Sequence, residues 1–332
     1  MADLRVGLIG LGMMGRHHAR ALREVDGVEL VAVADAYGDP HGVAGRLPLC
    51  GSIEELIDQG IDMAVCAVPT GLHEEVGLTL AAAGVHTLVE KPIADTVDAG
   101  ERLVEAFESA GLVGAVGHIE RFNPALQSLR SRLEAGDLGD VYQIATRRQG
   151  PFPARIADVG VVKDLGTHDI DLTSWLAQSP FTSVSARTST RSGRPHEDMV
   201  TASGQLENGV ITSHLVNWLS PMKERLTVVT GEKGAFVADT LTADLTFYEN
   251  GTFTTEWEAV SNFRGVSEGN ITRLALTKRE PLRSELEAFR DAALGVADNT
   301  VTMREGLATL RVAEAMIEAA NSNSTIGLPA WR

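Results

Sequence analysis

Two distant segments of the chain carry side chains that could accept a proton from an alcohol and polarise its oxygen. Glu90-Lys91-Pro92 follows an apolar run, and Asp164, His168 and Asp171 lie within one downstream segment. Oxidation of a secondary alcohol needs a cofactor that accepts hydride, a group that accepts the hydroxyl proton and a group that polarises the oxygen. A histidine suits the proton and a lysine ammonium suits the oxygen. The segments predict an oxidoreductase site, and the alternative for Lys91 is an ordinary surface lysine at a strand end.

The downstream segment is expected to bring its three residues to one face of a helix. If residues 163–176 are helical, Asp164 lies one turn before His168, and Asp171 lies about one turn after it. Asp169 would then point elsewhere. A carboxylate on the shared face could orient the histidine or contact substrate. The alternative is a solvated or capped helix histidine without a catalytic role.

A glycine-rich turn near the start of the chain would position the cofactor. Gly10-Leu11-Gly12-Met13-Met14-Gly15 separates an apolar run, residues 4–9, from residues 16–24, which have helical spacing. In such a strand-turn-helix unit the first glycine permits the turn, the second lets a pyrophosphate approach, and the third allows close packing. The helix N-terminus offers N–H groups to the phosphate, although many glycine-rich turns bind nothing. The residues assigned to dinucleotide binding are Gly10, Gly12, Met13, Met14 and Gly15.

Asp35 bears on the choice of cofactor. It ends a second apolar run, residues 28–34, twenty residues after Gly15. An acid at this position is expected to accept hydrogen bonds from the adenosine ribose and to repel a 2'-phosphate, so NAD is favoured over NADP. The alternative is a strand-end acid that caps the next turn.

Strands and helices continue to alternate as far as residue 119. The expected strands are 63–68, 85–90 and 112–117, and the expected helices are 72–83 and 95–110. This alternation predicts an α/β Rossmann domain, residues 1–119, with a doubly wound parallel sheet. Ligands bind such sheets at the carboxyl ends of the strands, where Pro69, Thr70, Glu90 and Lys91 fall.

Residues 120–332 are expected to form an α+β domain for substrate binding and oligomerisation. A helix at 124–135 precedes several runs of alternating character, which predict a large, mostly antiparallel open sheet. Two later segments, 284–294 and 303–320, return to helical spacing and are expected to pack at the domain junction. An open sheet with one uncovered face has apolar residues to bury, so a homo-oligomer, either a dimer or a tetramer, is expected.

The composition limits the partners. The 332 residues carry a formal net charge of −16 with acids spread along the chain, so neither nucleic acid nor an anionic membrane is an expected partner. Cys50 and Cys66 have no ligand-spaced neighbours, so neither disulfides nor a metal site are expected. With no apolar run of transmembrane length and no signal-peptide pattern, a cytoplasmic location is expected.

The combination of motifs resembles the Gfo/Idh/MocA family of oxidoreductases over essentially the whole chain. The resemblance rests on the glycine turn, Ala67-Val68-Pro69-Thr70 with His73, Glu90-Lys91-Pro92, Arg121-Phe122-Asn123-Pro124, and Asp164 through His168 to Asp171. It implies an NAD(P)-dependent dehydrogenase that acts on a CH–OH group of a sugar or polyol.

The resemblance also implies roles for single residues. Lys91 matches the catalytic lysine, His168 the acid/base histidine, and Asp164 the aspartate one turn earlier. Asp171 matches a position that often faces substrate, and the proline after the lysine is often cis. The implied cofactor contacts are Pro69, Thr70, His73, Glu90, Lys91 and Arg121, and the implied substrate contacts are Lys91, Asn123, Asp164, His168 and Asp171.

Within the family, segments between residues 117 and 164 look most like those of UDP-N-acetylglucosamine 3-dehydrogenases. Arg147, Arg148 and Arg155 flank a Gly/Pro-rich loop there, and guanidinium groups suit a diphosphate. We therefore assign Arg148 and Arg155 to substrate binding. The alternative is that these arginines are solvated or paired with the many acids of the chain.

Three functions follow. The leading hypothesis is NAD-dependent oxidation of a sugar ring hydroxyl, at carbon 3 of UDP-N-acetylglucosamine. A dehydrogenase for inositol or a free sugar is the nearest alternative, and a nucleotide-sugar substrate is distinguished from it by the arginine loop. The third is a catalytically silent regulator that senses a dinucleotide, against which the retention of Lys91, Asp164 and His168 argues.

Overall fold

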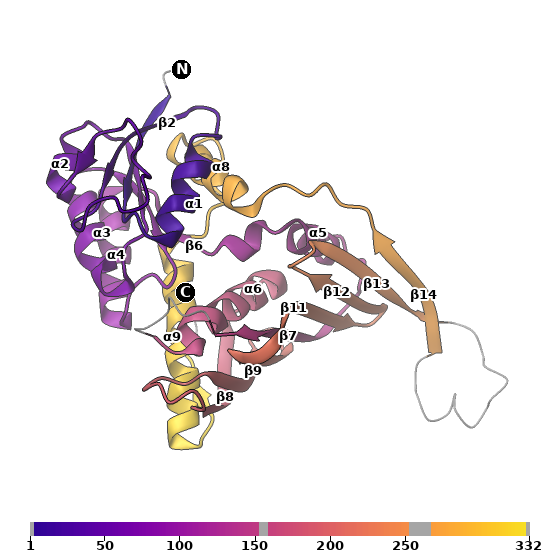
Figure 1. Ribbon diagram of the computed structural model, residues 1–332. Helices are drawn as coiled ribbons and strands as arrows, with labels where there is room; N and C mark the ends of the chain where they lie inside the picture. Colours follow the sequence, from indigo (N-terminus) through magenta and orange to yellow (C-terminus); the bar gives the residue numbers. More distant parts are fainter. Residues whose placement is uncertain (1–2, 153–158, 252–266, 330–332) are drawn as a thin grey trace. The chain divides into compact units, whose positions relative to one another are not determined.

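A computed structural model describes residues 3–152, 159–251 and 267–329 (Figure 1). The chain forms two compact units. The first comprises residues 1–119 and 280–311, and the second comprises residues 120–279 and 312–332. Residues 280–311 therefore group with the first unit, whereas the division expected from the sequence left them in the second.

The first unit is built on a parallel sheet of six strands in the order β3-β2-β1-β4-β5-β6. The strands are β1 (Leu4–Ile9), β2 (Val28–Ala34), β3 (Leu49–Cys50), β4 (Met63–Cys66), β5 (His86–Glu90) and β6 (Gly114–Gly117). After β1 the chain adds strands on one side of it, and from β4 onward it adds them on the other. This reversal creates a switch point between β1 and β4, which is where doubly wound sheets bind ligands.

Helices cover both faces of this sheet and confirm the predicted Rossmann arrangement. Their bounds are α1 (Met13–Leu22), α2 (Ile53–Ile57), η1 (Thr70–Leu72), α3 (His73–Ala82), α4 (Val97–Ala110), α8 (Pro281–Ala293) and α9 (Met303–Ser322). One buried core joins the sheet to α2, α3, α4 and the start of α9. A second core joins its other face to α1 and α8. Both faces of each central strand are buried, as the near-continuous apolar runs predict.

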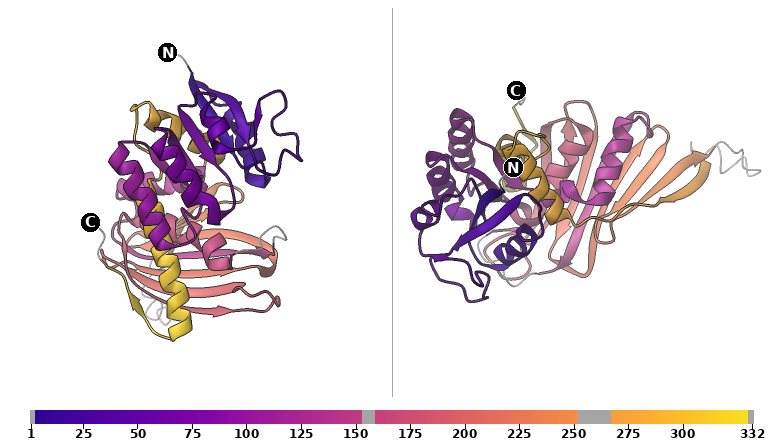
Figure 2. Two further views of the ribbon diagram at one scale, coloured as in Figure 1. Left: turned by 90° about the vertical axis from the view of Figure 1, so that its left-hand side faces the viewer. Right: turned by 90° about the horizontal axis from the view of Figure 1, so that it is seen from above.

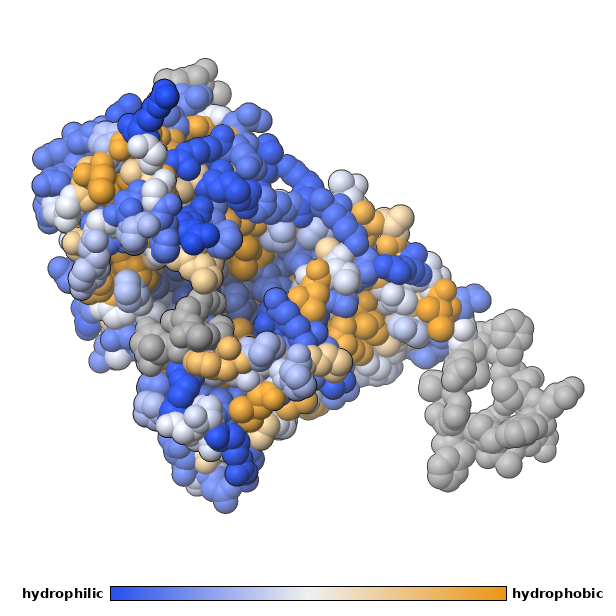
Figure 3. Space-filling model, viewed as in Figure 1, coloured by the Kyte–Doolittle hydropathy of each residue, from blue (hydrophilic) through white to orange (hydrophobic). Residues whose placement is uncertain are grey.

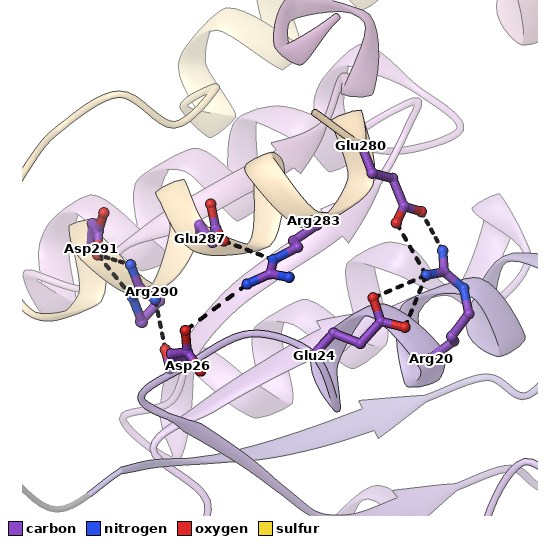
Figure 4. Close-up of polar contacts among 8 residues, drawn as sticks. All are labelled: Arg20, Glu24, Asp26, Glu280, Arg283, Glu287, Arg290 and Asp291. Atoms are coloured by element: carbon purple, nitrogen blue, oxygen red, sulfur yellow. Dashed lines mark hydrogen bonds and ion pairs between the residues drawn. The ribbon is translucent and has the colours of Figure 1, made fainter. Parts of the chain in front are cut away.

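Helix α8 is attached to α1 by apolar packing and by a surface network of ion pairs (Figure 4). Arg20 pairs with Glu280, and Arg290 donates to the Asp26 carbonyl oxygen at 2.6 Å. These pairs are largely exposed, and such pairs contribute little because water screens them and ordering long side chains costs entropy. The apolar face of α8 therefore carries the attachment. This face contributes Leu282, Leu286 and Phe289 to the core that α8 shares with α1.

The second unit is built on a nine-stranded mixed sheet in the order β14-β13-β12-β11-β7-β10-β9-β8-β15. Its strands are β7 (Val141–Pro151), β8 (Phe181–Ser189), β9 (Met199–Leu206), β10 (Ile211–Asn217), β11 (Leu219–Gly231), β12 (Gly234–Asp239), β13 (Asp244–Gly251), β14 (Ser267–Leu274) and β15 (Ile326–Gly327). All described pairings are antiparallel except β7 with β10. The mostly antiparallel sheet is thus confirmed, and β14 and β15 are additional strands that the sequence analysis missed.

Helices and sheet share a single core in the second unit. Helices α5 (Pro124–Glu134) and α6 (Thr167–Ala177) and the last part of α9 bury apolar residues together with the strands. In Figure 2 the strands of this sheet lie side by side, with the C-terminal part of α9 (yellow) across them. On the strands, buried residues alternate with more exposed ones, as expected for a sheet covered on one face.

The surface agrees with the charged composition. Most of the face in Figure 3 is hydrophilic, with apolar residues in small groups. Among the described helices, none combines the length and the apolarity that crossing a membrane requires.

Candidate active site

The glycine turn leaves room for a ligand where the sequence predicted a pyrophosphate. Gly10 has φ of +88°, and a Cβ there would lie 2.6 Å from the backbone of Ala67. A Cβ on Gly15 would lie 1.9 Å from the Gly10 carbonyl oxygen, which shows how closely α1 approaches β1. By contrast, a Cβ on Gly12 would meet no described atom within 4 Å. Since no side chain caps the start of α1, its N–H groups suit an anion.

Asp35 lies at the end of β2 and organises this turn. Its carboxylate accepts hydrogen bonds from the backbone N–H groups of Leu11 and Tyr37, both at 2.8 Å. A carboxylate has about four acceptor sites, so two backbone contacts leave capacity for ribose hydroxyls. The expected capping role and the expected ribose role are therefore compatible in this geometry.

Lys91 follows β5 directly, at the same edge of the sheet. The Lys91–Pro92 peptide bond is cis, as the family resemblance implied. Glu90 is buried and accepts hydrogen bonds from His18 Nε2 at 2.7 Å and from the Lys91 backbone N–H at 3.2 Å. Burial by itself would raise the pKa of Glu90, but the hydrogen bond from His18 and the nearby charge of Lys91 outweigh burial, and the pKa is lowered. Glu90 is therefore ionised, and both of its carboxylate oxygens accept hydrogen bonds from other groups of the protein.

His73 ties together the loops that follow β4 and β5. It is buried, and its ring nitrogens face the carbonyl oxygens of Pro92 at 2.9 Å and Val68 at 3.0 Å. Burial lowers the pKa of this imidazole. The contacts hold Pro92 beside the loop of Pro69 and Thr70, which begins η1. The predicted cofactor contacts of Pro69, Thr70 and His73 stay predictions.

The segment with the candidate acid/base histidine is helical but not uniformly α-helical. Val162–Gly166 forms a π-helical turn, labelled η3, and α6 begins at Thr167. Because a π turn bonds residues five apart, the simple α-helical spacing expected between Asp164 and His168 is altered. Asp164 is buried and His168 is half-buried. Such π turns are frequent at functional sites.

Asp171 and Arg121 are paired with each other. Arg121, in η2 (Ile119–Phe122), donates from Nε at 2.8 Å and from Nη2 at 2.6 Å to the two carboxylate oxygens of Asp171. Only 1% of the Asp171 side chain is exposed. This bidentate pair fixes α6 against η2. The predicted contact of Asp171 with substrate and that of Arg121 with cofactor stay predictions. The pair counts against both, because each side chain already bonds to the other.

Arg148 is also paired with other residues of the protein. Its Nε donates to Asp169 at 3.0 Å and its Nη1 donates to Glu120 at 2.7 Å, and 4% of its side chain is exposed. Asp169 is buried on α6, where its carboxylate meets this guanidinium. Burial raises the pKa of Asp169 to about 6 despite the arginine. Arg148 is thus paired with acids of the chain, which is the alternative expected for these arginines. The predicted diphosphate contact of Arg148 stays a prediction, and the two ion pairs count against it.

The other two residues assigned to substrate binding differ in what the structure describes. Asn123 is buried and caps α5, since its Oδ1 accepts from the Ala125 N–H at 3.0 Å while its Nδ2 donates to the Thr240 carbonyl oxygen at 3.0 Å. Arg155 lies outside the described residues. Arg147, at the other end of the loop, forms an exposed pair with Glu224 at 3.2 Å.

Two residues of the site were not found from the sequence. His18 and Glu120 each meet a residue that the motifs singled out, namely Glu90 and Arg148. A signal existed for His18, because it lies on the inward face of α1 with Ala19 and Leu22, where a titratable side chain requires a partner. Glu120 carries no comparable local signal.

The described chemistry falls into two sets. The first unit offers helix N–H groups for a phosphate, a carboxylate for a ribose and an ammonium group. The second offers the half-buried imidazole of His168 and the buried carboxylate of Asp164 on one helical segment. No group of three or more His, Cys, Asp or Glu is arranged to hold a metal within the parts of the chain that the structure covers.

Comparison with known proteins matches both parts of the chain to one family of oxidoreductases. Residues 4–118 match the oxidoreductase family with an NAD-binding Rossmann fold, and residues 126–237 match the Gfo/Idh/MocA C-terminal domain. The chain is 29% identical to UDP-N-acetylglucosamine 3-dehydrogenase of Acidithiobacillus ferrooxidans over 96% of each chain. It is also 29% identical to inositol 2-dehydrogenase 2 of Saccharopolyspora erythraea, over 97% of this chain and 94% of the relative.

A solved structure supports the same assignment. The crystallised UDP-N-acetylglucosamine 3-dehydrogenase of Acidithiobacillus ferrooxidans superposes with a TM-score of 0.83 at 27% identity, over 97% of this chain and 99% of the other. Sequence and structure therefore agree over both units. The chain belongs to the Gfo/Idh/MocA family and is an NAD-dependent oxidoreductase.

Proposed function

We propose that the protein oxidises the hydroxyl at carbon 3 of UDP-N-acetylglucosamine and so produces a 3-keto sugar. The observation that carries the proposal is the match to a UDP-N-acetylglucosamine 3-dehydrogenase over 96% of each chain, because this match includes the second unit, where the substrate-specific residues are expected. NAD, when bound, accepts the hydride.

In this proposal each candidate residue has one role. The Lys91 ammonium donates to the reacting oxygen and stabilises the negative charge that develops on it. His168 accepts the hydroxyl proton, and Asp164 orients the imidazole or contacts the sugar. The cofactor is held by the glycine turn through backbone N–H groups and by Asp35 through the ribose.

The decisive experiment is a screen of nucleotide sugars, free sugars and inositols for formation of NADH by absorbance. UDP-N-acetylglucosamine is expected to give the highest kcat/KM. A thermal shift with UDP alone, absent with myo-inositol, would support recognition of the nucleotide. Oxidation of inositol by a protein that ignores UDP-sugars would refute the nucleotide-sugar proposal.

Arg155→Ala tests the diphosphate contact directly. Loss of a charge-assisted hydrogen bond costs about 1.5 to 3 kcal/mol, or about one to two powers of ten in affinity. UDP-sugar binding should weaken by that amount, while binding of NAD and of a phosphate-free sugar should not change. Arg147→Ala is the matched control from the other end of the loop. If Arg155→Ala binds UDP-sugars like the parent, this arginine does not hold the diphosphate.

A dehydrogenase for inositol is the second candidate, and a specific observation favours it. Arg148, one of the two arginines assigned to a diphosphate, is buried between Glu120 and Asp169. A match of similar identity to an inositol 2-dehydrogenase also spans nearly the full chain. The same substrate screen separates the two candidates.

We also propose a homo-oligomer formed through the less buried face of the nine-stranded sheet. In-register residues Ile211, Tyr248 and Ile271 are 45%, 43% and 67% exposed, and they lie in one row across the strands. Burial of such residues stabilises association. Light scattering should show a dimer or tetramer that Ile271→Glu with Tyr248→Glu dissociates, and a monomeric parent would refute the proposal. The expected cytoplasmic location stays a prediction.

A further inference from the structure

A buried hydrogen bond links the helix after the glycine turn to the candidate catalytic loop. His18 Nε2 lies 2.7 Å from Glu90 Oε1, and the His18 side chain is completely buried. Since Glu90 is ionised, it can only accept, so Nε2 carries the proton and donates. The other ring nitrogen, Nδ1, is buried without a partner among the described residues. The imidazole therefore makes one hydrogen bond, and that bond goes to Glu90.

The surroundings of Glu90 are shaped to hold its carboxylate in one place. Its second oxygen, Oε2, accepts from the Lys91 backbone N–H at 3.2 Å. A Cβ on Gly117, which is paired with Glu90 across β5 and β6, would lie 3.2 Å from Oε2. A larger residue at 117 would thus crowd the carboxylate. One oxygen faces α1 and the other faces the backbone of Lys91.

Loss of the His18 donor would have a local consequence. A buried carboxylate that loses its partner is strongly disfavoured, because the desolvation cost is no longer offset. Glu90 would then take up a proton or turn away. Either change alters both the hydrogen bond to the Lys91 N–H and the negative charge next to the Lys91 ammonium.

We propose that His18 is a positioning residue for Lys91, which acts through Glu90 to fix the backbone and the charge environment of the catalytic loop. The inference rests on the proposed catalytic role of Lys91. Because His18 lies in the first turns of α1, the same contact ties the loop to the helix that receives the cofactor phosphate.

The first test does not need a substrate. Hydrogen exchange is measured by mass spectrometry on peptides that contain the Lys91 amide. His18→Leu, which keeps bulk but not the donor, should speed exchange there about tenfold or more, because the Glu90 acceptor is no longer held. His18→Gln retains a side-chain N–H and should restore protection, and the exposed neighbour His17→Leu should have no effect. If His18→Leu does not fold, Glu90→Gln replaces it with the same expected increase.

The second test uses turnover. With a substrate from the screen, His18→Leu should lower kcat by about ten- to a hundredfold with little change in KM, and His18→Gln should recover most of it. In a Lys91→Ala background His18→Leu should have almost no further effect, because both act on one group.

The outcomes separate this inference from the proposed function. Unchanged exchange in His18→Leu or Glu90→Gln would overturn the positioning role, and so would an effect on kcat that is fully additive with Lys91→Ala. A parent that oxidises nothing in the screen would instead refute the proposed function, and the exchange experiment would still decide the link between His18, Glu90 and Lys91.

Discussion

The two units handle charge in different ways. In the first unit the glycine turn and the start of α1 present backbone N–H groups, while Asp35 and Glu90 accept from the backbone N–H groups of Leu11 and Lys91. In the second unit the α6 segment is surrounded by charged side chains that bond to one another, as Arg121 does with Asp171. One unit offers backbone groups to a ligand, whereas the other uses side-chain charges to build the site.

This difference explains why the sequence was more informative about the site in the first unit than about the charged residues of the second. A backbone N–H site needs small residues at fixed spacing, and that spacing is visible in the sequence. A guanidinium can meet a ligand or a carboxylate, and the sequence does not reveal which one lies within reach. Arg148 is the clear case, since its partners lie 28 and 21 residues away.

The largest expected effect tests whether the charges of the second unit are structural. Arg148→Met should lower the free energy of unfolding by about 3 to 5 kcal/mol, because the buried Glu120 and Asp169 would lose the guanidinium that bonds to both of them. Urea denaturation measures this loss. Arg102→Met, which removes an exposed pair with Glu74 in the first unit, is the control and should change stability little. A small loss for Arg148→Met would show that its carboxylates are not dependent on it.

Next in size is the effect of Lys91→Ala. Turnover should fall by roughly a hundredfold or more while NAD affinity is kept, because a charge beside the developing alkoxide is lost. Steady-state kinetics and NADH fluorescence titration check the two quantities. Near-normal turnover would assign Lys91 to the protein surface rather than to catalysis.

His168→Ala tests whether the candidate acid/base residue of the second unit is catalytic. Turnover should be lost, with a changed pH-rate profile, since proton removal would need another acceptor. The profile of kcat/KM for parent and variant is the measurement. A residual activity with the parental profile would identify His168 as structural.

A smaller effect is expected from a change of cofactor preference in the first unit. Asp35→Ser combined with Ala36→Arg should shift the preference toward NADP by about ten- to a hundredfold, because a repelling carboxylate is replaced by a partner for the 2'-phosphate. The ratio of kcat/KM for NAD and NADP reports the change. Unchanged selectivity would mean that Asp35 accepts hydrogen bonds only from the backbone of Leu11 and Tyr37 and does not contact the ribose.

The smallest expected effect is a pH dependence that originates in the second unit. Burial raises the pKa of Asp169 to about 6 from its usual 3.8, so its protonated form is favoured by folding. The stability it contributes is fully present below about pH 4 and is lost as the pH rises through about 6. The stability of the parent relative to Asp169→Asn should therefore fall across this range in thermal melts. A difference that does not vary with pH would contradict the raised pKa.

The sequence by itself determined the elements that depend on local rules. Strands β1, β2, β4, β5 and β6, the glycine turn, the position of Asp35 and the helix of α5 follow from apolar periodicity and from glycine and cap residues at set spacings, whereas the short β3 was not predicted. The family followed from the same motifs, because their order along the chain is distinctive.

Only the tertiary structure decided how the charged residues are paired and where the last third of the chain packs. His18 meets Glu90 across 72 residues, and α8 joins the first unit although it follows eight of the nine strands of the second unit's sheet. The physical reason is that a buried charge takes whichever partner the packing of distant elements brings within hydrogen-bond distance. Local spacing shows that such a residue needs a partner, and the fold selects which one.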